Sequence, residues 1–335
     1  MFAQFAWLLI VTLVGAERLW RVRRVVAGTT LARGPWWWAV GSGLAIVAVE
    51  WLALVMQQRG ASGALSQTAS ATALATLTWL PPLRFAVAVT AFGPLMSILG
   101  AQSPQERAWP WIVLSMWFML ALPAAEVLVL QQGQALEIHF ARGAFLWILL
   151  GLQLLNMIST RFWRGALCAT AAQMLLLSRD LPGVERLMKS SQLVAQAPWV
   201  PLVALSCAVL AVADVARGLP DRSPLSPLDR LWLDFRDLFG TLWSARVAER
   251  LNSFAQQREL PMVLHWTGWS EHAVQPSDQP QLPHSKQTTL PSRDATSKDS
   301  SALPAVNWNL LRRFVSRDWF ASRCRMPTES DRESE

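Results

Sequence analysis

Two carboxylates lie inside long apolar runs of this sequence, Glu50 and Glu126. A charged side chain inside a membrane-spanning helix is costly, and such residues commonly mark ion, proton or substrate sites. Amide side chains that can face these carboxylates occur in later apolar runs. The candidate polar site within the membrane therefore comprises Glu50, Glu126, Gln153, Asn156 and Gln173.

Two interpretations of this polar site are open. In the first, the carboxylates hold a proton or a cation, or line a polar cavity. Pro123 precedes Glu126 by three residues and would kink the helix to open that pocket. In the second, each carboxyl is protonated or hydrogen-bonded near the membrane interface and holds helices together. The sequence favours the second, structural interpretation.

The other residues that could take part in catalysis do not form the pattern of a known type of active site. Residues 60–63 match the G-x-S-G pattern of rhomboid-type intramembrane proteases, but they lie in a polar loop, and His139 is the sole histidine before residue 217. The remaining histidines and the three cysteines lack the spacing of metal ligands. No phosphate-binding glycine loop occurs. We therefore expect no enzymatic activity, no cofactor and no bound metal.

The composition divides the chain into a membrane block and an aqueous tail. Of the 335 residues, 52% are hydrophobic and 16% are charged, against about 25% charged in a typical soluble domain. Residues 1–216 contain nearly all the long apolar runs. They carry 14 Lys and Arg against 8 Asp and Glu, whereas residues 217–335 carry 16 against 15. The basic excess thus belongs to the membrane block, and we expect no nucleic-acid partner.

Seven apolar segments predict transmembrane helices, because a helix of about 20 apolar residues crosses the hydrocarbon core. The fold class expected is an all-α integral membrane protein with about seven spans and a cytoplasmic amphipathic-helix tail. The least certain segments are 71–84, which contains Pro81 and Pro82, and 162–178, which is short. The predicted spans are 2–16, 36–56, 85–100, 109–130, 143–160, 162–178 and 198–216.

Arginine and lysine in the loops predict the orientation of these spans. With the N-terminus outside, the inner side receives 12 arginines and the outer loops hold 5 Arg and Lys. The bias favours an N-terminus outside the cell (inner) membrane and a tail in the cytoplasm. The 19 tryptophans, with no tyrosine, are typical of residues at the membrane interface.

The tail contains a long amphipathic helix, predicted for residues 226–254. Ser226 is a favourable N-cap, Pro227 suits the first helical position, and Asp229 completes a capping-box-like pattern. Apolar residues recur at steps of three and four, and such a stripe must pack on the membrane surface, on the bundle or on a partner. The candidate partner-docking face comprises Leu231, Trp232, Phe235, Phe239 and Trp243.

The chain is therefore divided into four parts. Residues 1–216 form the transmembrane bundle, and 217–270 form the juxtamembrane helix with a short segment packed on it. Residues 271–304 are rich in Ser, Thr, Pro and Gln, which predicts a disordered linker. Residues 305–335 contain a short amphipathic segment and a frayed end.

Two runs carry a resemblance to other proteins. They are FGPLMSILGAQSPQERAWPWIVLSMW at 92–117 and LDRLWLDFRDLFGTLWSARVAERLN at 228–252. They resemble segments of uncharacterised multi-pass membrane proteins of planctomycete-type bacteria. The resemblance implies an inner-membrane location and no particular activity.

Two functions follow as hypotheses. The first is a non-enzymatic subunit or scaffold of a bacterial inner-membrane complex, which docks a protein partner through the 226–254 helix. It is favoured because the tail has an apolar stripe while the membrane block lacks a catalytic constellation. The alternative is a transporter or channel that uses a carboxylate site at Glu50 and Glu126. In both, the lipid bilayer surrounds residues 1–216.

Overall fold

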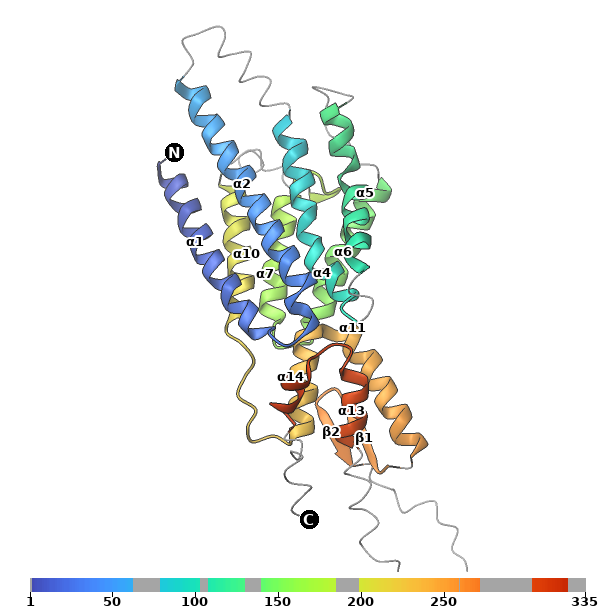
Figure 1. Cartoon of the computed structure of the whole chain (residues 1–335). Helices are drawn as coiled ribbons and strands as arrows, with labels where there is room; N and C mark the ends of the chain where they lie inside the picture. The colour runs from blue at the N-terminus through green and yellow to red at the C-terminus, as the bar shows by residue number, and fades with distance from the viewer. Residues whose placement is uncertain are drawn as a thin grey trace, which may run out of the picture. The chain divides into compact units, whose positions relative to one another are not determined.

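The computed structural model describes residues 2–62, 79–102, 108–129, 140–184, 199–258, 260–271 and 303–324 (Figure 1). The chain divides into two compact units, Met1–Leu219 and Pro220–Glu335. They are called unit 1 and unit 2 below. The predicted linker at 271–304 and the predicted frayed end lie almost entirely outside the described residues.

Unit 1 is a bundle of helices that lie side by side, with successive helices running in opposite directions (Figure 1). Within the described residues, five helical segments are long and apolar enough to cross a membrane: Phe2–Val25, Thr30–Gln58, Trp79–Leu99, Trp109–Val129 and Phe140–Ile158. The elements are α1 Phe2–Val25, η1 Thr30–Ala32, α2 Gly34–Ser62, η2 Val89–Phe92, α4 Gly93–Leu99, α5 Trp109–Val129, α6 Phe140–Ile158, α7 Trp163–Leu176 and α10 Val200–Ala216. The expected helical structure is confirmed, and the five apolar helices are compatible with the expected membrane protein.

The last two helices of unit 1 are shorter. Helix α7 has 14 residues and α10 has 17, so α7 alone extends about 21 Å, less than the ~30 Å hydrocarbon core. Both nevertheless pack in the bundle: α10 contacts α7 and α1, and α7 contacts α6. Gly165 permits the close approach of α7 and α10, because a Cβ there would lie 3.2 Å from the carbonyl oxygen of Ala211.

The third helical segment begins earlier than the sequence predicts. A span starting at Phe85 was expected because Pro81 and Pro82 interrupt the apolar run. Instead the helical segment is Trp79–Leu99, and both prolines lie in its first turn. Proline is tolerated there because the first backbone N–H groups of a helix have no intrahelical acceptor. The helix consequently gains residues before Phe85, including Arg84.

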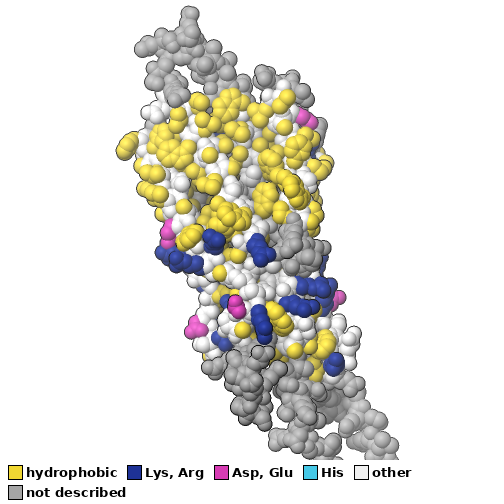
Figure 2. Space-filling model, viewed as in Figure 1, with side chains coloured by type: hydrophobic (Ala, Val, Ile, Leu, Met, Phe, Trp, Pro, Cys, Tyr) yellow, Lys and Arg dark blue, Asp and Glu magenta, His cyan; other side chains and the backbone are white. Residues whose placement is uncertain are grey.

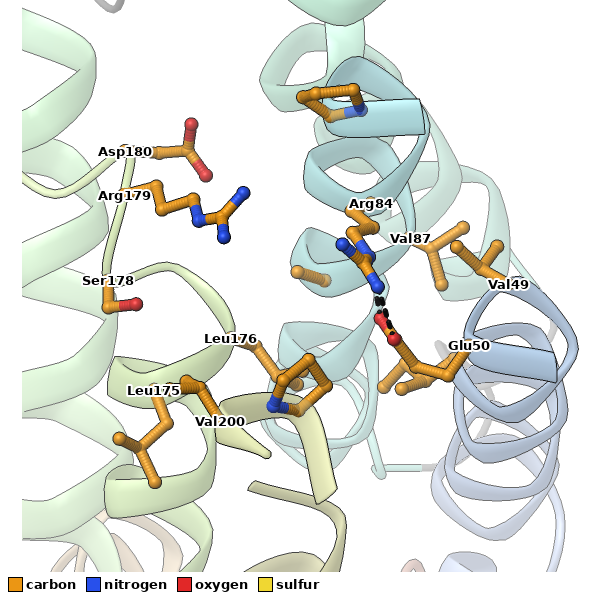
Figure 3. A pocket seen from close by; sticks show the side chains of 14 residues that line it. Val49, Glu50, Arg84, Val87, Leu175, Leu176, Ser178, Arg179, Asp180 and Val200 are labelled. Carbon is orange, nitrogen blue, oxygen red and sulfur yellow. Dashed lines mark hydrogen bonds and ion pairs between the residues drawn. The ribbon is translucent and has the colours of Figure 1, made fainter. Parts of the chain in front are cut away.

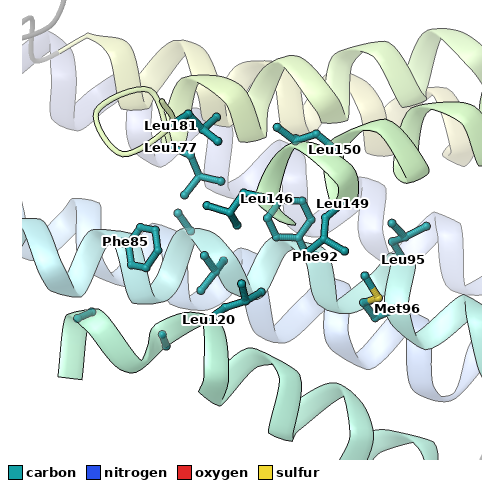
Figure 4. Close-up of a cluster of buried hydrophobic side chains, with 14 of the residues drawn as sticks. Phe85, Phe92, Leu95, Met96, Leu120, Leu146, Leu149, Leu150, Leu177 and Leu181 are labelled. Carbon is teal, nitrogen blue, oxygen red and sulfur yellow. The ribbon is translucent and has the colours of Figure 1, made fainter. Parts of the chain in front are cut away.

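A cluster of buried hydrophobic side chains holds the later helices of unit 1 together (Figure 4). Phe85 and Phe92 of the third segment lie among Leu120 of α5 and Leu146 of α6, and each is at most 4% exposed. In contrast, large apolar side chains cover the outside of unit 1 (Figure 2). A soluble protein would not present such a surface, so it is suited to contact lipid.

Unit 2 is built on the long helix α11, Pro227–Gln257. Its other elements are β1 Met262–His265, β2 Gly268–Glu271, α13 Leu303–Leu311 and α14 Arg317–Ala321. The predicted N-cap is confirmed, since Ser226 Oγ accepts a hydrogen bond from the Asp229 N–H at 3.1 Å. The strands form an antiparallel hairpin with Leu264 opposite Trp269. Asn252 of α11 bonds both backbone groups of Leu264, so the predicted packing of this segment on the helix is confirmed.

Helix α11 is broken in the middle, which the sequence did not predict. Gly240 has φ 78° and ψ −175°, a conformation that essentially only glycine adopts without strain. The two halves of the helix therefore meet at an angle rather than forming one straight rod.

The apolar stripe of α11 is covered by the chain itself. Leu231, Trp232, Phe235, Phe239 and Trp243 are each 7% exposed or less. Phe314, between α13 and α14, packs edge-on against Phe235, Phe239 and Trp243, with ring centroids 4.9–5.4 Å apart. The membrane surface, the bundle or a partner was expected as the cover. The structure assigns that role to the segment after residue 303 of the same chain.

An ion-pair network closes unit 2. Arg222 donates to Asp234 and Asp237, each at 2.6 Å, and Asp237 also accepts from Arg236 at 3.0 Å. Arg323 donates to the second oxygen of Asp234 at 2.7 Å. Because Arg222 precedes α11 and Arg323 follows α14, the network ties the beginning and the end of the described part of unit 2 to one helix.

Candidate functional site

The site in unit 1 is centred on an ion pair between Glu50 and Arg84 (Figure 3). Arg84 Nε donates to Glu50 Oε1 at 2.9 Å, and Arg84 Nη2 donates to Glu50 Oε2 at 2.6 Å. Such a bidentate pair is among the stronger polar interactions in proteins. The Glu50 side chain is 8% exposed and the Arg84 side chain 26%. The pair therefore lies in the bundle with its arginine end nearer to open space.

The depth of this pair follows from its place on α2. Glu50 lies 16 residues after Gly34, the first residue of that helix. At 1.5 Å per residue this is about 24 Å along the helix. Glu50 therefore lies beyond the midpoint of the ~30 Å core, measured from the end of the bundle that carries Arg33.

A cavity of about 100 Å³ adjoins the ion pair. A water molecule occupies about 30 Å³ in the liquid, so the space accommodates a few waters or a small solute. Besides Glu50 and Arg84, the polar side chains on its wall are Ser178, Arg179 and Asp180, which follow α7. The apolar wall comprises Ile46, Val49, Pro81, Val87, Ala88, Leu175, Leu176, Val200 and Pro201.

The charges on this wall are balanced. In Figure 3, Arg179 and Asp180 extend from the segment after α7 toward the side on which Arg84 lies. Two guanidinium groups and two carboxylates thus border one small space between α2, the third helical segment, α7 and α10. Such a wall can hydrogen-bond either sign of charge on a solute. Among the described residues, no group of three or more His, Cys, Asp or Glu side chains is placed to hold a metal ion.

The structure does not bring all the predicted polar residues to this cavity. Glu126 is exposed on α5 and does not line it. Gln153 is half-buried and Asn156 is buried, both on α6, and neither lines the cavity. Gln173 is buried on α7, where its Nε2 donates to the Ala91 carbonyl at 2.8 Å. Of the five predicted residues, only Glu50 is a wall residue.

Pro123 lies within α5, which continues to Val129. It is buried in the bundle, and the pocket that it was expected to open is not the cavity beside Glu50, which has no α5 residue on its wall.

Some polar residues of unit 1 were missed by sequence reasoning. Arg84, Arg179 and Asp180 line the cavity but were not among the residues predicted for the polar site. Asp214 on α10 was also missed: its Oδ2 accepts from the Gly165 N–H at 3.0 Å and its Oδ1 accepts from Arg217 at 2.8 Å. An aspartate within the last predicted span was the signal that could have identified it.

No protein-family model, curated protein or solved structure matches the chain, so the site is interpreted from its own geometry.

Proposed function

We propose that unit 1 crosses a bacterial inner membrane seven times, with the N-terminus outside and unit 2 in the cytoplasm. Helices α7 and α10 pack in the same bundle as the five longer spans, which supports counting them as spans. The proposed inner side holds 12 arginines against 5 Arg and Lys on the outer side, and this bias supports the orientation.

Within this topology, the cavity beside Glu50 and Arg84 binds a small polar solute on its way across the membrane, so the protein is a transporter or channel. The observation that carries this proposal is the bidentate pair, with a buried Glu50 and a partly exposed Arg84, on the wall of a cavity large enough for water. The open side of this space supports access of water or a small solute to the charged groups on its wall. Glu126 has no part in this site.

Docking of a partner through the 226–254 helix is the second candidate. Its apolar stripe is of the kind that binds amphipathic helices, and the chain's own Phe314 already packs on it. A partner would have to displace the 303–324 segment from the stripe. That displacement costs the burial of several aromatic side chains, so the geometry supports the cavity more directly.

Water access to the cavity tests the first proposal. The three cysteines are replaced by alanine in the full-length protein, and Ser178 is changed to Cys as a reporter on the wall. A small, charged, membrane-impermeant methanethiosulfonate should label Ser178→Cys in proteoliposomes. Ser97→Cys is the matched control, because Ser97 is also buried but is not on the wall. Equal labelling at the two positions would contradict a hydrated cavity.

Transport itself is then measured in proteoliposomes loaded with a pH-sensitive dye or with radiolabelled glycine, chloride or phosphate. Any flux should fall at least tenfold in Glu50→Gln and in Arg84→Gln and persist in Glu126→Gln. Flux that survives the first two substitutions would refute the assignment of the site.

A further inference from the structure

One end of unit 1 carries a dense group of arginines. The exposed members are Arg21, Arg23, Arg24, Arg33, Arg164 and Arg217. They come from the ends of different helices, which meet here: Gly218 after α10 lies against Val25 of α1, and its carbonyl accepts a hydrogen bond from Arg161 before α7. This group is called the basic end.

Few carboxylates neutralise the basic end. Glu17 pairs with Arg18 and Arg21, and Asp214 pairs with Arg217. Within the part of the chain that the structure describes, no carboxylate lies within ion-pair distance of Arg23, Arg24 or Arg164. Three exposed guanidinium groups therefore remain available to an external anion.

Aromatic rings position two of these groups. The Arg23 guanidinium lies 5.5 Å from the Trp20 ring and 5.1 Å from the Trp36 ring. Trp36 is itself held, since its Nε1 donates to the Leu19 carbonyl at 3.0 Å. Arg164 lies 5.3 Å from the Trp163 ring. Stacked guanidinium groups of this kind keep their N–H donors free for planar or tetrahedral oxyanions such as phosphate.

The basic end also carries exposed apolar side chains, which a free inorganic ion would not contact. Trp20 is 54% exposed, Trp37 63% and Trp163 42%. Exposed tryptophan is typical of the level at which headgroups meet acyl chains. Figure 2 shows Lys and Arg side chains along the edge of the apolar surface of unit 1. The surface therefore fits a ligand that joins a phosphate to hydrocarbon.

We infer that the basic end binds anionic phospholipids, with the headgroup phosphate held by Arg23, Arg24 and Arg164. The acyl chains lie along the exposed tryptophans and the apolar outer surface of unit 1. Inorganic phosphate shares the headgroup chemistry but lacks the chains, so it binds much more weakly. This interaction is independent of any solute in the cavity beside Glu50.

The test uses the full-length protein in a neutral detergent, with lipid retained per protein counted by native mass spectrometry. Dioleoyl phosphatidylglycerol and dioleoyl phosphatidylcholine are supplied in equal amounts. The wild type should retain phosphatidylglycerol at least tenfold more than phosphatidylcholine. The triple variant Arg23→Gln, Arg24→Gln, Arg164→Gln should lose most of this preference, since each basic residue near an anionic surface contributes about fivefold in binding.

Two further variants test whether the preference comes from a defined site. The first controls for a change in net charge, and the second controls for misfolding. Arg250→Gln, Arg312→Gln, Arg313→Gln removes the same charge from exposed positions of unit 2 and should keep the preference. The charge-preserving variant Arg23→Lys, Arg24→Lys, Arg164→Lys should keep at least half of the preference for phosphatidylglycerol. An equal loss in the unit 2 variant, no lipid preference in the wild type, or full displacement by 10-fold excess inorganic phosphate would each overturn the inference.

Discussion

Removing either partner of the Glu50–Arg84 pair should destabilise unit 1, and removing Arg84 should cost more than removing Glu50. Removing one partner of a buried pair typically costs about 3–5 kcal/mol, because the other charge is left poorly solvated. The Glu50 side chain is 8% exposed, so the carboxylate that Arg84→Gln leaves behind has little water, and we expect a cost of about 3 kcal/mol. Arg84 is 26% exposed and its long side chain can reach water, so Glu50→Gln should cost only about 1–2 kcal/mol.

The double variant Glu50→Gln, Arg84→Gln gives the coupling free energy between the two side chains. With both charges replaced by amides, no stranded charge remains, and the total cost should be about 2 kcal/mol. The two single costs together should then exceed the cost of the double variant by about 2 kcal/mol or more, which is the signature of direct coupling. The free energy of unfolding is measured by titrating sodium dodecyl sulfate into mixed micelles and following helicity by circular dichroism.

Glu126→Gln is the matched control for this cycle. It makes the same chemical change on α5, where the side chain is exposed, and should alter the unfolding free energy by less than about 0.5 kcal/mol. Strictly additive single and double variants would refute the reasoning, and so would an Arg84→Gln variant that is more stable than Glu50→Gln.

Three predictions concern unit 2. Gly240→Ala places a side chain on a backbone with φ 78°, and the resulting strain should lower the free energy of unfolding by about 1–3 kcal/mol in thermal unfolding. Gly41→Ala, where a Cβ meets nothing within 4 Å, should be neutral. Equal effects of the two substitutions would contradict backbone strain at Gly240. Asp237→Asn leaves Arg222 and Arg236 without their shared carboxylate and should cost about 3 kcal/mol; an unchanged melting temperature would show that the network adds no stability. Burial raises the pKa of the Cys324 thiol, so less thiolate is present at pH 8, and alkylation by iodoacetamide should be at least tenfold slower than in the urea-unfolded chain; equal rates would show that the thiol is accessible.

The helices of unit 1 could be predicted because a long apolar run in lipid must satisfy its own backbone hydrogen bonds, which a helix does. The start of the third segment could not, since Pro81 and Pro82 interrupt the run in the sequence but are harmless in a first turn. That difference of a few residues decided whether Arg84 lay within a helix or before one.

The composition of the site was only partly predictable for a related reason. A buried carboxylate at Glu50 follows from its apolar neighbours, but its partner depends on how α2 and the third segment are rotated about their axes. Apolar runs that are hydrophobic on all sides do not encode that rotation. The same uncertainty explains Glu126, which the sequence placed in the site and the structure places on an exposed face of α5.

In unit 2 the periodicity of α11 predicted a buried stripe correctly but not its cover. The pattern defines which face is apolar and says nothing of what lies opposite. Phe314 is a single aromatic residue in a short amphipathic stretch, and it contacts Phe239 before the bend at Gly240 and Trp243 after it.

The separation of Phe314 from the stripe that it covers has a consequence for synthesis of the protein. Trp243 leaves the ribosome about 70 residues before Phe314, which at roughly 5–20 residues per second is an interval of about 4–14 s. During that time the aromatic side chains of α11 that contact Phe314 lack this ring. The nascent chain thus passes through a stage in which this aromatic face lacks its final cover, and shielding by a chaperone or by the membrane surface during that stage should raise the yield of folded protein.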